Sequence, residues 1–214
     1  MSAHRKAVHA ALTLVVLLLT GGTESKGAPL VIDDFEDVSD WSGLALETGL
    51  VREGAGAGRW ADTVARTSIR RSFEPPLDLS SQDHVGLWLH SAVANGAELQ
   101  LVFSSEDDSV EGSDYYSKEL LVDWQGWRWI WLSKEDLPPS RSPLGWDQIG
   151  SISLASSGWG HEPLPDTDLV LDYLVAGNAV LRRVVRSQGW SGEDFVYTFD
   201  LVLVEPDGTP LVST

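Results

Sequence analysis

The 214-residue sequence contains no cysteine, so disulfides contribute nothing to the stability of its fold. The lack of cysteine also excludes a lipoprotein, because no thiol is present to carry the lipid. Long apolar runs are scarce as well. The longest covers residues 7–20, and its fourteen residues are fewer than a membrane-spanning helix needs.

That short apolar run follows Arg5 and Lys6 and precedes a small, polar segment that begins at Gly21. This order is typical of a secretory signal peptide, which we place at residues 1–27. An N-terminal anchor helix is the alternative interpretation. We therefore expect a secreted protein of 187 residues that acts extracellularly, in the periplasm or at the cell surface. Without disulfides, such a fold must rely on a large core, on a metal ion or on both.

Basic residues are few: the chain has 15 Lys and Arg against 32 Asp and Glu, a formal charge of −17. Such a surface repels nucleic acid and anionic membranes, so neither is an expected partner. It also disfavours polymers rich in sulfate or uronate. Most of the acidity is explained by solubility outside the cell.

Catalytic motifs are missing too. The sequence has neither the G-x-S-x-G motif of a serine nucleophile nor the H-E-x-x-H motif of a zinc protease. Its three histidines beyond the signal peptide, His84, His90 and His161, are not spaced as metal ligands. We therefore expect no enzyme activity from this chain, although a longer parent protein could include a catalytic domain.

What the sequence does contain is a series of short segments with period-two hydrophobicity, separated by Gly, Pro, Asn, Asp and Ser clusters. This pattern predicts an all-β fold, namely a jelly-roll β-sandwich. The expected strands are 30–35, 44–52, 67–73, 85–91, 98–104, 115–122, 127–132, 149–155 and 169–175. Gly54, Gly56 and Gly58 are interpreted as turn glycines.

Strand alternation assigns the faces of these segments. The aliphatic sets that should point into the core are Val85, Leu87 and Leu89; Leu99, Leu101 and Phe103; and Ile130 with Leu132. Trp88, His90, Trp129 and Trp131 then point outward. This is a large aromatic area to leave exposed to water without a function. Six further tryptophans are assigned to core or turn packing, with Trp159 at a rim: Trp41, Trp60, Trp124, Trp127, Trp146 and Trp159.

A domain boundary is expected near residue 176, so that residues 28–176 form the jelly roll. Two further strands, 180–186 and 195–204, follow a joint at residues 176–179. Two strands do not make an independent domain. We interpret residues 177–214 as the first strands of a second β-sandwich, and the alternative is a pair of extra strands packed on the first domain.

Three patches together carry a family resemblance: Asp33-Asp34-Phe35-Glu36-Asp37 before Trp41, Val51-Arg52-Glu53-Gly54 before Gly56-Ala57-Gly58, and Leu169-Val170-Leu171-Asp172. The stretch 149–159 adds to it. The set resembles galactose-binding-like jelly-roll domains, a group that contains many carbohydrate-binding modules of secreted polysaccharide-degrading enzymes. The likeness covers residues 30–176.

The resemblance implies a structural calcium site where the first strand, a loop after the second and the last strand meet. Its expected ligands in this sequence are Asp34 or Glu36, the Glu53-Gly54 segment and Asp172. Hard oxygen donors of this kind suit Ca²⁺. The family often has two successive acidic residues on the last strand, whereas here Tyr173 follows Asp172.

The leading functional hypothesis is a non-catalytic, monomeric module that binds a polysaccharide or oligosaccharide. Indole rings can stack on the C–H faces of sugars, so Trp88, Trp129 and Trp131 are the expected platforms. Hydrogen-bonding partners are expected from the nearby side chains of His90, Gln100 and Tyr115.

Two alternatives remain open. A structural or protein-interaction sandwich would keep these indoles covered by loops or by the next domain. A jelly-roll polysaccharide lyase would use Arg70, His90 and Tyr115.

Overall fold

The computed structural model describes residues 29–178, 180–191 and 194–204. The expected signal peptide at residues 1–27 lies outside these ranges. The described chain forms β-strands with one short 3₁₀ turn, Lys134–Asp136, and no α-helix. No helix in the described ranges is therefore long and apolar enough to cross a bilayer. The all-β prediction is confirmed.

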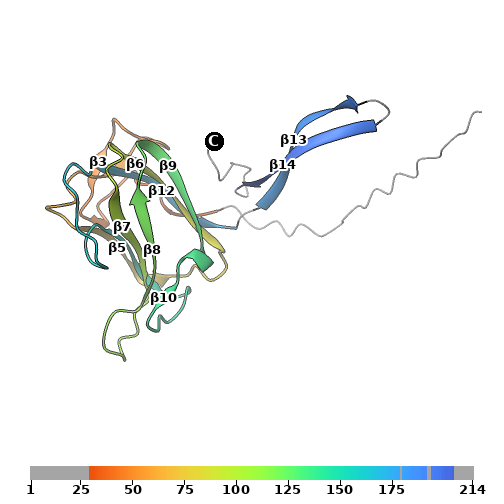
Figure 1. Ribbon diagram of the computed structural model, residues 1–214. Coiled ribbons are helices and arrows are strands. Elements are labelled where there is room, and N and C mark those ends of the chain that lie inside the picture. Colours follow the sequence, from red (N-terminus) through yellow and green to blue (C-terminus); the bar gives the residue numbers. More distant parts are fainter. Residues whose placement is uncertain (1–28, 179, 192–193, 205–214) are drawn as a thin grey trace, which may run out of the picture.

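Two antiparallel sheets pack face to face as a sandwich (Figure 1). Sheet A has the order β3-β4-β12-β6-β9, and β1 also pairs with β12. Its strands are β1 (Leu30–Asp33), β3 (Ala45–Glu47), β4 (Ala57–Trp60), β6 (His84–Ser91), β9 (Gly126–Ser133) and β12 (Leu169–Gly177). Sheet B has the order β10-β8-β7-β11-β5-β2. Its strands are β2 (Trp41–Ser42), β5 (Ser68–Leu77), β7 (Ala97–Ser104), β8 (Tyr115–Val122), β10 (Pro139–Ser140) and β11 (Ile149–Ala155).

The core lies between the two sheets and contains the aliphatic sets expected from alternation. Leu89, Leu99 and Phe103 are fully buried, and Leu101 nearly so. Ile130 is also in the core, with Leu132 packed at its margin. Because side chains alternate along a strand, these positions fix which of their neighbours face outward.

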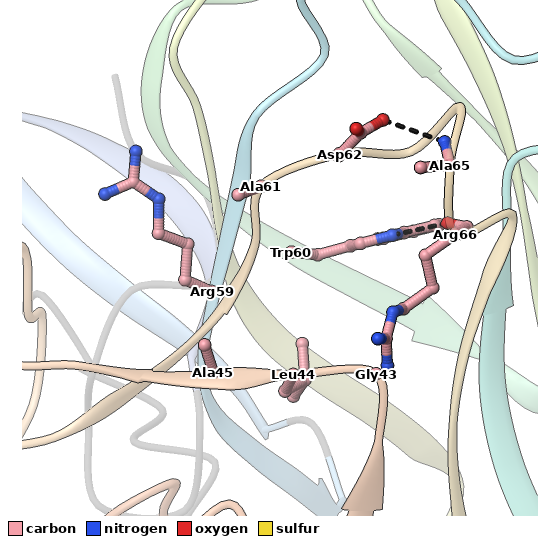
Figure 2. Close-up of a pocket in the computed structure, with 9 residues that line it drawn as sticks. All are labelled: Gly43, Leu44, Ala45, Arg59, Trp60, Ala61, Asp62, Ala65 and Arg66. Atoms are coloured by element: carbon pink, nitrogen blue, oxygen red, sulfur yellow. Dashed lines mark hydrogen bonds between the residues drawn. The ribbon is translucent and has the colours of Figure 1, made fainter.

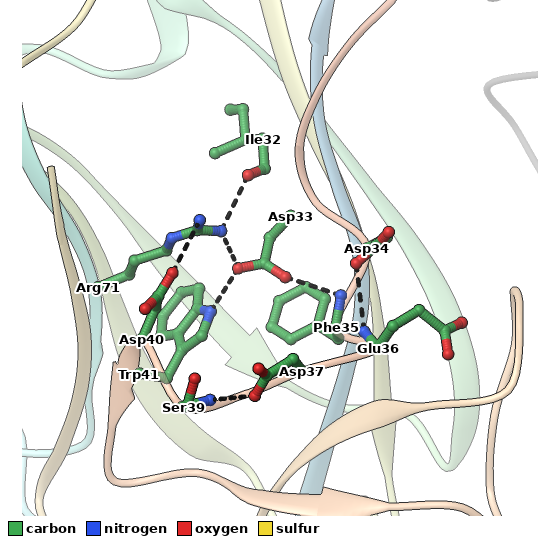
Figure 3. A network of polar contacts seen from close by, with 10 residues as sticks. All are labelled: Ile32, Asp33, Asp34, Phe35, Glu36, Asp37, Ser39, Asp40, Trp41 and Arg71. Atoms are coloured by element: carbon green, nitrogen blue, oxygen red, sulfur yellow. Dashed lines mark hydrogen bonds and ion pairs between the residues drawn. The ribbon is translucent and has the colours of Figure 1, made fainter.

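One polar network ties the two sheets together (Figure 3). Asp33, at the end of β1 in sheet A, forms a buried ion pair with Arg71 of β5 in sheet B. The same carboxylate accepts a 2.7 Å hydrogen bond from the indole N–H of Trp41 on β2, and another from the backbone N–H of Phe35. Phe35 stacks on Trp41 with ring centroids 5.4 Å apart. These contacts join the first strand to the opposite sheet.

The strand expected at residues 44–52 is shorter in the structure. Within that range only β3 (Ala45–Glu47) forms, and residues 48–56 are a loop that leads into β4. Gly58 is therefore a strand residue and not a turn glycine. A Cβ atom at Gly58 would lie 2.6 Å from Leu44 and 2.9 Å from Phe35, so glycine is needed for close packing rather than for a turn.

After β12, strands β13 (Val180–Ser191) and β14 (Asp194–Val204) pair with each other in a two-stranded sheet. Both expected strands are therefore present. Whether they open a second sandwich stays a prediction, since residues 205–214 lie outside the described ranges.

Candidate functional site

The outer face of sheet B is lined by small and polar side chains. Because Leu99, Leu101 and Phe103 of β7 point into the core, Gln100 and Val102 point away from it. Both are nevertheless only 7% exposed. The Gln100 amide donates a 2.8 Å hydrogen bond to the hydroxyl of Ser117 on β8. The centre of this face is thus a fixed, hydrogen-bonded surface.

An exposed tryptophan stands beside this surface. Trp159 lies in a turn after β11, where Gly158, Trp159 and Gly160 all have positive φ. The indole N–H donates a 2.8 Å hydrogen bond to the hydroxyl of Tyr115 on β8, and the two rings meet edge to face at 86°. Nearly half of Trp159, 48%, is exposed. The turn therefore presents one oriented indole to solvent.

The far side of the same turn is attached to β8 as well. The backbone N–H of His161 donates to the carbonyl of Gly158, which closes the turn. His161 also places its Nε2 atom 3.2 Å from a carboxylate oxygen of Glu119. Glu119 pairs with Gln100 across the β7–β8 ladder. Two side-chain contacts to one strand thus fix the position of the Trp159 turn.

We call this surface the polar face, and it consists of Arg70, Gln100, Tyr115, Ser117, Glu119, Trp159 and His161. Arg70 lies on β5 and points outward, because its neighbour Ile69 is in the core. The polar face combines an exposed aromatic ring with hydroxyl, amide, guanidinium and carboxylate groups. Such a set can hold a ligand that has both apolar C–H faces and hydroxyl groups.

The six predicted sugar-binding residues do not form one cluster. Gln100 and Tyr115 lie on the polar face of sheet B, whereas Trp88, His90, Trp129 and Trp131 lie on β6 and β9 of sheet A. Their expected proximity was wrong, because alternation gives the face of each strand but not the sheet that the strand joins. The exposed ring on the polar face, hydrogen-bonded to Tyr115, is Trp159, for which the sequence predicts only a rim position.

The outward orientation of the sheet A residues does agree with the prediction. Trp88 of β6 is paired with Trp129 of β9. The neighbouring residues Leu87, Leu89 and Ile130 face the core, so both indoles point to the outer face of the sheet. Their rings lie 5.1 Å apart, and Trp129 stacks on Trp131 at 5.9 Å. Trp127, which we had assigned to core or turn packing, packs on His90 on the same face at 5.2 Å. All four indoles are half-buried.

The lyase alternative required Arg70, His90 and Tyr115 to share one catalytic site. The structure puts Arg70 and Tyr115 on sheet B and His90 on sheet A. The hydrophobic core separates them, so these three residues do not form a catalytic constellation.

Burial lowers the pKa of the His90 side chain, and the Asp168 carboxylate opposes this shift.

The expected calcium ligands are not assembled either. Within the described ranges, no group of three or more His, Asp or Glu side chains comes together as a metal site. One Asp172 oxygen accepts hydrogen bonds from the backbone N–H groups of Arg52 and Glu53, at 2.8 and 2.9 Å. Glu36 accepts one from the N–H of Ala55, at 2.7 Å.

The calcium site stays a prediction. The loop offers N–H donors to one oxygen of Asp172 and to Glu36, where calcium would need oxygen ligands, but the other Asp172 oxygen is buried and has no hydrogen-bond partner among the described residues. Asp34 is exposed and accepts a hydrogen bond from the N–H of Glu36. Burial raises the pKa of Asp172, and the N–H donors partly oppose this shift. Asp172 and Glu36 therefore hold the 48–56 loop directly.

A pocket of about 340 Å³ lies next to β3 and β4 (Figure 2). Trp60 lines it and donates its indole N–H to the carbonyl of Arg66, at 2.8 Å. Asp62 accepts from the N–H of Ala65 and fixes the loop that forms one wall. These contacts shape the end of the sandwich, and no element of the polar face reaches this pocket.

Comparison with known proteins gives a fold relationship. No protein-family model matches the sequence, and no curated protein matches it. Among solved structures, the chain is similar to a family 11 carbohydrate-binding module from Clostridium thermocellum in complex with a β-1,3-1,4-mixed-linked tetrasaccharide. The TM-score is 0.52 at 16% identity, over 71% of this chain and 97% of that one.

The chain is also similar to the family 11 module of a cellulosomal cellulase from the same organism. That TM-score is 0.50 at 19% identity, over 70% of this chain and 94% of that one. These identities are too low to transfer a ligand. Residues 29–177 have the jelly-roll fold of a carbohydrate-binding module.

Proposed function

We propose that this chain is a non-catalytic carbohydrate-binding module that holds a larger exported protein on a neutral glycan. The observation that carries the proposal is the exposed Trp159 indole, fixed by Tyr115 beside the hydrogen-bonding side chains of the polar face. The export signal expected at residues 1–27 and the shared fold of glycan-binding modules support it.

In this proposal the sugar ring stacks on the free face of Trp159. Stacking requires a fixed ring, and the Tyr115 hydroxyl supplies that restraint because it accepts the indole N–H. The outward groups of Arg70 and Glu119 then contact sugar hydroxyls, and the largely buried His161 side chain holds Glu119 in place. Most of the binding energy comes from the buried apolar area of the stacked ring, and the polar contacts set the orientation.

The ligand class follows from charge. The chain has a formal charge of −17, and Glu119 adds a carboxylate to the site itself. Uronate-rich polymers are therefore disfavoured, and neutral ones are preferred. One similar structure contains a β-1,3-1,4-mixed-linked tetrasaccharide, so we propose a neutral, mixed-linked β-glucan as the first ligand to test.

Affinity electrophoresis tests the proposal. The protein is run in native gels with mixed-linked β-glucan, xylan or an alginate, and mobility is compared with a gel that contains no polymer. We expect a neutral polymer to retard the wild type, Trp159→Ala to be retarded much less than the wild type, and alginate to have no effect. Leu144→Ala, at an exposed position that is not part of the polar face, is the control and should behave as wild type. Unchanged wild-type mobility in every neutral polymer would refute the proposal.

A further inference from the structure

The outer face of sheet A carries a continuous band of aromatic rings. We call this band the aromatic stripe, and it consists of His84, Trp88, His90, Trp127, Trp129 and Trp131. Along β6 and β9 the neighbouring rings lie 5.3 Å apart for His84 and Trp131, 5.9 Å for Trp131 and Trp129, and 5.1 Å for Trp129 and Trp88, the first two pairs stacked and the third tilted. The stripe therefore runs along nearly the whole length of the two strands.

The indoles of the stripe lean over the sheet rather than stand away from it. A Cβ atom at Gly86 would lie 2.4 Å from the Trp131 ring and 2.6 Å from the Trp129 ring, so glycine lets both rings cross β6. Trp131 reaches Gly177 of β12. Beneath the rings, Val175 is fully buried although it lies outside the core cluster. The stripe is a built surface and not a row of loose side chains.

What this surface offers to solvent is apolar ring area. The indole N–H groups of Trp129 and Trp131 are buried and have no acceptor among the described residues, so the polar edges of these two rings face inward. The half-exposed parts of the rings are then faces and C–H edges. This is the kind of surface on which the C–H faces of sugar rings stack.

A cationic hydrogen-bond donor lies at the edge of the stripe. The Arg52 guanidinium is 4.4 Å from the centroid of the Trp88 ring, and Asp172 holds the Arg52 backbone in place. Arg52 is exposed and forms no ion pair within the described ranges. Its N–H groups are thus available to hydroxyl oxygens. Ring faces beside a fixed donor match the combination found on the polar face.

We propose that the aromatic stripe is a second glycan-binding surface, and that the module bridges two glycan chains. The ligand class rests on the proposed function above. The two sheets of a sandwich pack about 10 Å apart, and their outer faces point in opposite directions. An extended glycan bound to the polar face does not reach the stripe. Occupying both surfaces therefore requires two glycan chains. On a dense polymer, binding at one surface raises the effective glycan concentration at the other, so the module as a whole binds with higher avidity.

A sandwich-capture assay tests the bridging. The protein is bound to a surface coated with mixed-linked β-glucan and washed, and a fluorescent soluble β-glucan is then added. We expect the wild type to retain the fluorescent polymer. Trp159→Ala and the double variant Trp129→Ala/Trp131→Ala should each bind the coated surface but retain at least tenfold less fluorescent polymer. The triple variant should not bind the surface, and Leu144→Ala should bridge as the wild type does.

A second measurement does not depend on removing indoles that cover Val175. The Trp159→Ala protein is labelled with 5-fluorotryptophan and titrated with soluble β-glucan oligosaccharide. We expect saturable ¹⁹F shifts at Trp129 and Trp131, assigned from single Trp→Phe variants, and no shift at the buried Trp60. No shift at either stripe indole would overturn the second surface, even if the alanine variants fold poorly.

The outcomes separate the two proposals. If Trp159→Ala loses all binding while the wild type binds, the stripe inference fails and the proposed function stands. If Trp159→Ala binds as the wild type does and the stripe variant does not bind, the polar face does not bind glycan and the stripe is the sole glycan site.

A protein strand is the competing occupant of this sheet, because strand β9 pairs only with β6 in the described chain. A wild-type dimer in light scattering that becomes monomeric in the stripe variant would overturn the inference.

Discussion

Trp159 donates its indole N–H to the hydroxyl of Tyr115, which lies 44 positions earlier in the chain. The bond joins a turn that follows β11 to the first residue of β8, so it fixes an exposed ring with respect to a sheet surface. Ligand stacking benefits from this restraint, because a ring that is already oriented loses less conformational entropy on binding.

Tyr115→Phe tests the restraint. The substitution keeps the ring contact and removes only the hydroxyl that accepts the Trp159 N–H. A typical hydrogen bond contributes about 1 kcal/mol, so we expect glycan affinity to fall about fivefold with little change in melting temperature. Calorimetric titration measures the effect. Equal affinities for Tyr115→Phe and the wild type would show that the hydroxyl does not restrain the ring.

Removing Asp33 should weaken the junction between the sheets. Asp33→Ala leaves the Arg71 guanidinium without its buried partner and the Trp41 N–H without its acceptor. We expect a loss of about 3–5 kcal/mol in the free energy of unfolding, measured in urea. The neighbouring Asp34 is exposed, so Asp34→Ala is the matched control and should lose less than about 1 kcal/mol. Equal losses in both variants would argue against the inter-sheet role.

His90 should make the fold less stable in mild acid. Burial lowers its pKa in the folded state below the usual 6.5, so the unfolded chain binds the proton more readily. Stability supplied by neutral His90 is therefore present above about pH 6.5 and is lost as the pH falls below it. We expect the stability of wild type to fall more between pH 7.5 and 5 than that of His90→Gln. Identical pH profiles would contradict this.

The direct attachment of the 48–56 loop makes a prediction about calcium. Because Asp172 accepts two backbone N–H groups, Asp172→Ala leaves both without a partner and should cost about 1–3 kcal/mol. Asp172→Asn keeps an acceptor for both N–H groups but places its own amide N–H groups at the second, buried oxygen position, which has no partner, so it should lose less stability than Asp172→Ala. If the backbone N–H groups alone hold the loop, excess chelator leaves the melting temperature unchanged. A fall of several degrees with chelator would show that calcium holds this loop instead.

Much of the fold could be predicted from the sequence, because strand periodicity is a local property. Alternation placed Leu87, Leu99 and Leu101 in the core and turned Trp88 and Trp129 outward, and the structure agrees. The order of strands within each sheet is not local. Nothing in the alternation of β6 or β7 shows that they belong to different sheets, and this is why one predicted cluster became two surfaces.

The remaining differences also depend on tertiary contacts. The sequence predicts a turn at Gly58, whereas in the structure Leu44 and Phe35 pack so closely against it that no Cβ atom fits. The exposure of Trp159 depends on a turn of three residues with positive φ and on attachment to Tyr115. The glycines on both sides of Trp159 were the available signal for such a turn. The family resemblance implied calcium ligands at Asp34 or Glu36, Glu53 and Asp172, and in the structure backbone N–H groups of the loop donate to Asp172 and Glu36.

The central claim is that an oriented Trp159 on the polar face binds a neutral glycan. Isothermal titration of the wild type and Trp159→Ala with a mixed-linked β-glucan tetrasaccharide tests it most directly. We predict saturable binding to the wild type and at least a tenfold weaker affinity for Trp159→Ala, with both proteins equally folded by circular dichroism. Equal affinities of the two proteins would contradict the account.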